Sequence, residues 1–294
     1  MKTTASRTRE WFMQGVFTVC ACVSILAVAL ICIFLFANGM PAIFEIGPVN
    51  FLLGTTWKPS NDIYGILPFI LGSIYVTAGS LVVGVPIGLL TAVYMSRFAS
   101  RRVNRVLLPA VQLLAGIPSV VYGFFGVMVL APAVEQFIRN TPGLQGKGLS
   151  MFTASVLLGI MILPTIITVS KTSLDAVPDS YYEGSLALGA THERSVFCVI
   201  LPAAKSGVMS AVILGIGRAV GETMAVVMVA GNQPRMPKGL FEGLRTMTSN
   251  IVMEMGYAAD LHREALIATG VVLFVFILII NLCFSLVKGG SDHA

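Results

Sequence analysis

Residues 63–96 read IYGILPFILGSIYVTAGSLVVGVPIGLLTAVYMS and contain no Asp, Glu, Lys or Arg. About 20 consecutive apolar residues are enough for a helix to cross the hydrocarbon core of a bilayer, so this stretch is long enough to span a membrane. It lacks the alternation of apolar and polar residues that is typical of a barrel strand. The stretch therefore predicts a transmembrane helix.

Five further apolar blocks occur along the 294 residues, four without charged residues and one interrupted only by Arg218 and Glu222. Hydrophobic residues make up 56% of the chain and charged residues 11%, about half of the ~25% that soluble domains contain. These proportions predict an all-α integral membrane protein with about six transmembrane helices, which together form a single domain over residues 1–294. The helices are expected over residues 12–36, 66–94, 106–130, 149–170, 207–230 and 265–287.

The distribution of Lys and Arg between the predicted loops indicates an orientation. The loops on the side of the N-terminus carry more of them than the loops on the other side, beginning with Lys2 and including the cluster Arg97, Arg101, Arg102 and Arg105. Short cytoplasmic loops are enriched in basic residues, so we expect both termini in the cytoplasm of a multi-pass protein of the inner (plasma) membrane. The net charge of +5 arises from basic residues in these loops. It therefore does not indicate nucleic-acid binding, and we expect no nucleic-acid partner.

The resemblances to enzyme motifs fail on spacing. Gly146 and Lys147 suggest a phosphate loop, but the first Gly of that motif and the Ser or Thr after the Lys are both missing. His192 and Glu193 begin a zinc-protease motif in which Val196 stands at the place of the second His. The five cysteines form no CxxC pair, which argues against a disulfide framework. We therefore expect no catalytic residue, no metal, no cofactor and no ATP hydrolysis by this chain.

The segment 171–206, between the fourth and fifth predicted helices, is longer than a simple connection between neighbouring helices needs. Ser180 and Glu183 have the spacing of a capping box at the start of a helix. Gly189 can adopt the left-handed conformation that ends one. We predict two short helices joined by a turn at Gly189. From these residues alone, such helices could lie on the lipid headgroups or dock on another protein.

Four residues of this segment also have the spacing of the signature loop of ATP-binding cassette (ABC) importer permeases. In that family the pattern is Glu-Ala-Ala, three residues, Gly, nine residues, then Ile-x-Leu-Pro. The matching residues are Glu183, Gly189, Leu201 and Pro202. Gly184-Ser185 replaces the two alanines, and Val199 replaces the isoleucine. The resemblance implies that the loop is a coupling helix, which docks into a groove of a cytoplasmic ATPase.

Three further segments are similar to the permease subunits of phosphate importers. They are Asn61-Asp62-Ile63-Tyr64-Gly65, Gly116-Ile-Pro-Ser-Val-Val-Tyr-Gly123 and Gly217-Arg218-Ala-Val-Gly221-Glu222-Thr-Met-Ala-Val226. With the coupling loop they extend from the second predicted helix to the fifth. This resemblance implies phosphate as the substrate and three kinds of partner: a second permease subunit, a pair of identical ATPase subunits and an extracytoplasmic phosphate-binding protein.

Arg218 and Glu222 are four residues apart, so we expect them to share one face of the fifth predicted helix. A charged residue at the centre of the membrane costs about 2.5–3.5 kcal/mol on the insertion scale. Either Arg218 lines the phosphate path, or the two charges neutralise each other and fix helix packing beside Gly217 and Gly221. Because the pair would sum to zero charge, the path would need further cations from the second permease.

Other transport functions remain open from the sequence. The chain could be a permease for another oxyanion, such as sulfate or molybdate. It could also be a secondary transporter that uses Glu222 as an ion carrier, although the inverted repeats typical of many such transporters are absent. A membrane scaffold without transport would leave Arg218 and Glu222 unexplained.

Overall fold

The computed structural model describes residues 4–289, so Lys2, which belongs to the basic N-terminal side, lies outside the described residues. The regular secondary structure of the described chain is helical apart from one short hairpin, β1 (Trp57–Lys58) with β2 (Ile63–Tyr64), in which Trp57 pairs with Tyr64. The long helices are α1 (Thr4–Ile46), α3 (Leu67–Val93), α7 (Met151–Asp175), α11 (Lys205–Gly221) and α14 (Asp260–Gly289).

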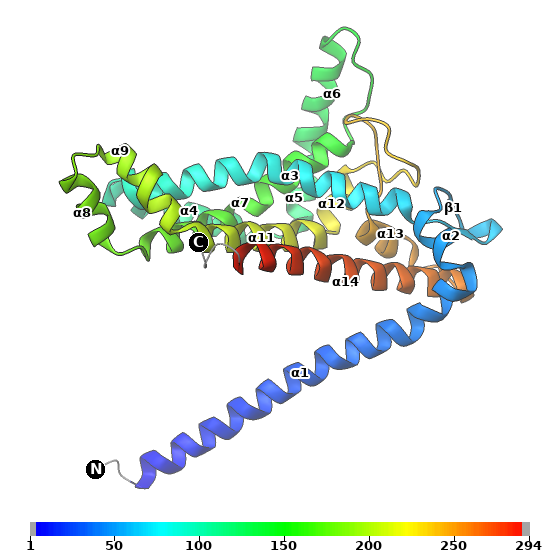
Figure 1. The fold of residues 1–294 in the computed structure, drawn as a ribbon. Coiled ribbons are helices and arrows are strands. Elements are labelled where there is room, and N and C mark those ends of the chain that lie inside the picture. Colours follow the sequence, from blue (N-terminus) through cyan, green and yellow to red (C-terminus); the bar gives the residue numbers. More distant parts are fainter. Residues whose placement is uncertain (1–3, 290–294) are drawn as a thin grey trace.

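Four of these helices, α3, α7, α11 and α14, run side by side and form the body of the molecule (Figure 1). At one end of the body lie α8 (Asp179–Ala187) and α9 (His192–Ser195), and we call this the α8 end. At the other, the hairpin end, lie α2 (Pro48–Leu53) and the hairpin. From the hairpin end α1 runs away from the body, so that much of its length is exposed.

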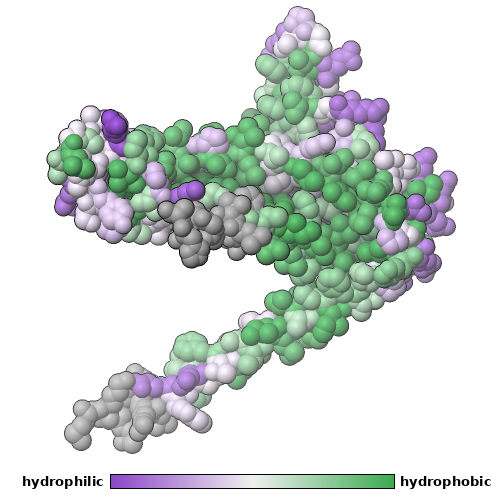
Figure 2. Space-filling model, viewed as in Figure 1, coloured by the Kyte–Doolittle hydropathy of each residue, from purple (hydrophilic) through white to green (hydrophobic). Residues whose placement is uncertain are grey.

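Five helices are long and apolar enough to cross a membrane, and a sixth is obtained if one bent pair counts as a single span. The five spans are Glu10–Ile46, Leu67–Phe98, Ser119–Asn140, Met151–Asp175 and Asp260–Cys283. The bent pair is His192–Ala203 with Lys205–Gly221, which meet at 69°. Figure 2 shows apolar residues over the sides of the body and of α1, and hydrophilic residues near the two ends of the body and around the projecting α6. The prediction of an all-α, multi-pass membrane protein is confirmed.

Close contact between α3 and α7 holds the centre of the body together. A Cβ added at Gly84 would lie 2.7 Å from the side chain of Ile162, and one added at Gly88 would lie 2.8 Å from Ile166. Both distances are too short for a Cβ to fit. The backbones of α3 and α7 can therefore approach closely only because these two positions have no side chain. Ile162 and Ile166 belong to the largest buried apolar cluster, which also includes residues of α5, α11 and α12.

The third predicted span, residues 106–130, had the wrong boundaries. The structure instead has an amphipathic helix α4 (Arg101–Gly116), a break at Ile117 and Pro118, and then α5 (Ser119–Phe125). The π-helical η3 (Gly126–Leu130) and α6 (Ala131–Asn140) continue the span, so helix extends beyond residue 130, where the predicted span ended. A proline disfavours helical geometry in the residue before it, and Ile117 is extended.

The first predicted span, residues 12–36, ended too early, because α1 continues through Asn38 and Pro41 to Ile46. A Cβ at Gly39 would lie 2.6 Å from Val271 of α14, so packing against α14 keeps this stretch helical. The fifth span, predicted as continuous over 207–230, is divided into α11 and α12 (Met224–Val229).

The residues after α12 fold back into the body instead of forming an exposed loop. Residues 243–250 are all buried, and they include the start of helix α13 (Met247–Glu254). The N–H of Met247 donates a hydrogen bond to Ser73 Oγ on α3, at 3.0 Å. Gly72 allows this approach, because a Cβ there would overlap the carbonyl oxygen of Arg245.

Replacing Gly72 by Ala is expected to destabilise the protein by about 1–3 kcal/mol, because the methyl group collides with backbone that cannot move freely. The measurement is the thermal unfolding midpoint of the purified protein. Gly15→Ala is the matched control, since Gly15 lies in α1 with no atom within 4 Å of an added Cβ. Equal midpoints for the two variants would show that α13 does not pack on α3 in this way.

Candidate substrate path and coupling loop

The break in the fifth span lies at Glu222. This residue ends α11 with an extended backbone, φ −68° and ψ 130°, and α12 starts two residues later. Its carboxylate Oε1 accepts a hydrogen bond from the N–H of Ala225 at 3.3 Å. Its carbonyl oxygen accepts one from Thr248 Oγ1 of α13 at 3.1 Å. Glu222 therefore caps the start of α12 and joins it to α13.

Arg218 lies in the last turn of α11 and is half-buried. Its guanidinium NH1 donates to Thr165 Oγ1 of α7 at 3.4 Å. No ion pair within 4.0 Å joins Arg218 to Glu222, both of which lie in the described part of the chain. The expectation that the two residues share one helix face was wrong, because the helix ends between them. The neighbouring Ala219 is buried in the largest apolar cluster and anchors this turn.

A second break lies close to the first. The hydroxyl of Tyr122 donates to the carbonyl of Leu114 at 2.9 Å and so bridges the interruption at Pro118. Helices α5 and α12 are in contact, and a Cβ at Gly123 would lie 2.5 Å from Met228 Sδ. The fold thus brings together segments 116–123 and 217–226, which are a hundred residues apart in the sequence.

Gly217 and Gly221 are exposed, and no atom of the described chain lies within 4 Å of a Cβ added to either. They therefore take no part in helix packing within this chain. The absence of side chains at these positions leaves the surface next to Arg218 open.

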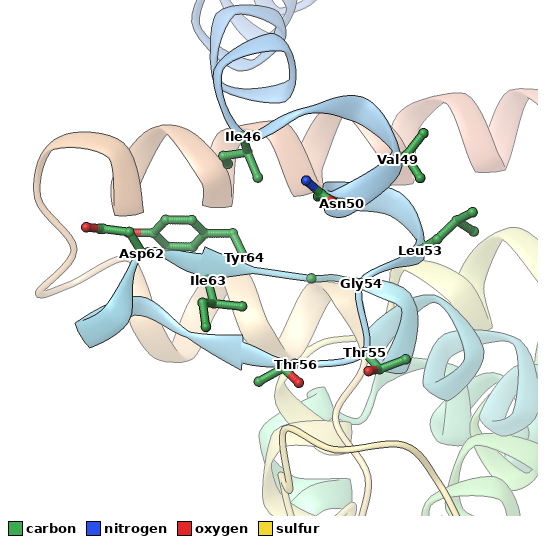
Figure 3. A pocket seen from close by; sticks show the side chains of 11 residues that line it. Ile46, Val49, Asn50, Leu53, Gly54, Thr55, Thr56, Asp62, Ile63 and Tyr64 are labelled. Atoms are coloured by element: carbon green, nitrogen blue, oxygen red, sulfur yellow. The ribbon is translucent and has the colours of Figure 1, made fainter.

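The third segment, 61–65, forms part of the hairpin. Asp62 has a positive φ of 54° and accepts a hydrogen bond from the Tyr64 hydroxyl at 3.2 Å. Burial, with a smaller effect of Asp62, raises the pKa of Tyr64 to about 12. Asp62 and Tyr64 border a pocket of about 440 Å³ (Figure 3). Its only charged lining residue is the Asp62 carboxylate, so the pocket does not favour an anion and we assign no phosphate to it.

The segment expected to couple to an ATPase contains the two predicted short helices. Gly189 follows the end of α8 with φ +85°, which confirms the left-handed turn. The capping box is wrong: α8 starts at Asp179 after Pro178, and no side chain caps it. Because Pro178 fixes the backbone just before the helix, Ser180 falls inside the first turn. Glu183 and Pro202 are exposed, and Leu201 packs against the buried cluster at the α8 end.

Polar contacts fasten this loop to the end of α3. Arg97, in the π-helical turn η2 (Tyr94–Phe98), donates to the carbonyl of Leu174 at 2.8 Å and lies 3.5 Å from Asp179 of α8. The hydroxyl of Tyr182 and His192 Nδ1 are 2.8 Å apart, which joins α8 to α9. Leu188 projects from the loop with 91% of its surface exposed.

The sequence reasoning missed a buried charged pair, Arg245 with Glu254, in the segment that follows α12. Their spacing of nine residues matches no capping or helix-pair rule. The signal available was an Arg and a Glu within a stretch otherwise rich in Thr, Ser, Asn and apolar residues, 244–255.

Residues 84–290 match the family model described as binding-protein-dependent transport system inner membrane component. The chain belongs to this family. The chain is 40% identical over 274 residues to the probable ABC transporter permease protein YqgH of Bacillus subtilis, with 90% of this chain and 87% of the relative covered. It is 34% identical to the phosphate transport system permease protein PstC of Mesorhizobium japonicum, with 85% and 81% covered. It is a permease subunit of an ABC transporter.

Two solved structures show the same fold at low sequence identity. A chain of a bacterial alginate ABC transporter superposes with a TM-score of 0.66 at 15% identity, covering 97% of the permease and 96% of that chain. A chain of the MetNI methionine ABC transporter gives 0.54 at 20% identity, covering 77% and 94%. These likenesses confirm the fold and carry no information on substrate.

Proposed function

We propose that the permease imports inorganic phosphate as one of two membrane-spanning subunits of an ABC importer. One observation carries the proposal: the two segments similar to phosphate-importer permeases, 116–123 and 217–226, meet in the fold where two spans are broken, and Arg218 lies there. Relatives named phosphate transport system permease protein PstC, at 34% and 35% identity, support phosphate over other oxyanions.

The charge on Arg218 suits this function. Since the Glu222 carboxylate caps α12 and does not pair with Arg218, the positive charge of the guanidinium is not cancelled by the neighbouring Glu. A guanidinium fork can donate two parallel hydrogen bonds to phosphate oxygens. A single Arg on an open surface gives a weak site, and transport requires a site that the ion can leave.

The same geometry argues against Glu222 as an ion carrier. A protonated Glu222 would keep an oxygen that accepts from the Ala225 N–H. It would lose the charge that strengthens this bond, so each protonation would weaken the cap on α12. Because the chain belongs to the ABC permease family, we infer instead that ATP hydrolysis on partner subunits drives transport. The proposed partners are a second permease, a pair of identical ATPase subunits and an extracytoplasmic phosphate-binding protein.

We assign the contact with the ATPase to the loop at the α8 end. Its supports are the family spacing of Glu183, Gly189, Leu201 and Pro202, the turn at Gly189 and the exposed side chain of Leu188. Contacts from Arg97 to both α8 and α7 give a route by which movement of the loop reaches the membrane helices.

Competition for uptake tests the choice of oxyanion. In cells that depend on this importer, excess unlabelled phosphate is expected to suppress uptake of labelled phosphate, and equal excess of sulfate or molybdate is expected to leave it unchanged. Suppression by sulfate or molybdate, with their own labelled forms taken up, would reassign the substrate.

A single cysteine at Arg102 is expected to react with thiol reagents only from the cytoplasmic side, and one at Ser60 only from outside. Both side chains are exposed, and they lie in the α4 region and in the hairpin respectively. The measurement is labelling of intact cells and of inverted vesicles by a membrane-impermeant maleimide. The opposite pattern would reverse the orientation and remove the loop at the α8 end from the ATPase.

A further inference from the structure

A polar network that the proposed path does not use is buried at the hairpin end. The Glu254 carboxylate pairs with the Arg245 guanidinium, and the two side chains are only 8% and 9% exposed. The other carboxylate oxygen accepts hydrogen bonds from Trp57 Nε1 at 2.8 Å and from His262 Nε2 at 2.9 Å. Because a carboxylate only accepts, His262 Nε2 is the donor in this bond.

The Arg245 guanidinium makes further contacts besides the ion pair with Glu254. Its Nε donates to the carbonyl of Asn232 at 3.2 Å, and NH1 also donates to Asn250 Oδ1 at 2.9 Å. The guanidinium carbon lies 5.8 Å from the ring centroid of Phe69 on α3. The network therefore joins the hairpin, the loop after α12, α13 and the start of α14.

Burying two charges is costly, since the desolvation penalty is several kcal/mol per ion. Well-packed apolar side chains in place of a buried ion pair often stabilise a protein at least equally well. A buried ion pair is therefore weak evidence of stability and better evidence of a fixed arrangement. What the pair fixes is the first turn of α13, because Arg245 directly precedes Thr246, the residue that caps this helix.

The first turn of α13 lies against the break in the fifth span. Thr248 donates to the carbonyl of Glu222, and Met247 is held by Ser73 of α3. In Figure 1, α13 lies between α12 and the hairpin end of the body. Thr246, Thr248, Ser249 and Asn250 are all buried there, which places hydroxyl and amide groups beside the proposed anion path.

We propose that α13 is the external gate of the path and that the Arg245–Glu254 pair is the lock that holds it closed. The inference rests on the proposed path beside Arg218 and Glu222. With the pair intact, α13 keeps Thr248 out of contact with water. When the pair separates, the first turn of α13 leaves Glu222 and opens the external end. Arg245 and Glu254 are positioning residues, since both act through α13.

Thiol accessibility of Thr248 tests the lock without reference to substrate. The probe is a membrane-impermeant maleimide applied from outside to the complete complex, with the five native cysteines replaced and Thr248→Cys introduced. Thr248 is 7% exposed, so little labelling is expected in this parent. In Arg245→Met with Glu254→Met, which leaves no lone buried charge, labelling is expected to be at least about tenfold faster, equivalent to about 1.4 kcal/mol.

Two further variants complete the test, and only complexes that copurify with their partners are scored. Arg139→Met with Glu135→Met removes an exposed ion pair on α6 (75% and 45% exposed) and is expected to leave labelling unchanged. Arg245→Lys keeps the charge but cannot make all the bonds of the guanidinium, so intermediate labelling is expected.

Protection of Thr248→Cys in the assembled double variant would overturn the proposal, because packing alone would then hold α13. Rapid labelling of the parent would overturn it as well, since the gate would already be open. The labelling result does not depend on phosphate. A complex with the expected labelling that carries another oxyanion would disprove the proposed substrate and leave the lock standing.

Discussion

Arg218→Ala is expected to reduce phosphate uptake by at least about a hundredfold in a complex that still assembles, because two charge-assisted hydrogen bonds of about 1.5–3 kcal/mol each are lost. Arg218 contacts only Thr165 Oγ1 at 3.4 Å among the hydrogen bonds found for its side chain in the described residues. Its removal therefore disturbs little of the fold. The measurement is uptake of labelled phosphate per copurified complex, which separates a transport defect from an assembly defect.

Conservative variants refine this result. Arg218→Lys keeps the charge but loses the bidentate fork and is expected to transport poorly. Glu222→Gln keeps an oxygen that can accept from the Ala225 N–H, so it is expected to retain much of the activity. Arg139→Ala, at an exposed cation on α6, is the control for a general effect of lost charge.

The double variant Arg218→Leu with Glu222→Leu separates two interpretations of these charges. If they only neutralised each other, removing both would restore transport, because no lone charge would remain buried. Since the structure shows no ion pair between them, we expect the double variant to assemble and move no phosphate. Substantial uptake would rule out an essential role of Arg218 in the path.

Gly189→Val is expected to abolish stimulation of ATP hydrolysis by the binding protein in a complex that still inserts. Gly189 has φ +85°, a region that costs an L-residue about 1–2 kcal/mol and a β-branched one more. The turn between α8 and α9 would shift, and Leu188 would be displaced with it. The measurement is the ATPase rate of the reconstituted complex with and without the binding protein.

The control for this variant is Gly15→Val. Gly15 lies within α1, outside the coupling loop, its added Cβ has no atom within 4 Å, and its φ is not positive. The same side chain is therefore added without backbone strain. Normal stimulation in Gly189→Val, or equal loss in both variants, would contradict the assignment of this loop to coupling.

The sequence predicted the helical membrane fold well because uncharged blocks of more than 20 residues have no other stable form in lipid. It also predicted the turn at Gly189, because only the local backbone decides that conformation. The boundaries of the helices inside an uncharged block were harder to predict. The block containing Pro118 holds parts of α4, α5 and α6, and nothing in its hydrophobicity marks where the membrane span begins.

Features that depend on distant residues could not be found by local rules. The break at Glu222 is held by Thr248, 26 residues away, and by the cap on Ala225. The pairing of Glu254 with Trp57 joins residues 197 positions apart. A spacing of four residues predicted a shared helix face for Arg218 and Glu222, but tertiary contacts end the helix between them.

The most direct test of the account is uptake of labelled phosphate into vesicles that contain the permease with its second permease and ATPase subunits. Uptake is expected only when ATP is inside with the ATPase and the phosphate-binding protein is outside. It should disappear in Arg218→Ala, while the amount of assembled complex stays unchanged. Uptake driven by an ion gradient without ATP, or ATP-driven uptake of another oxyanion in place of phosphate, would contradict the account.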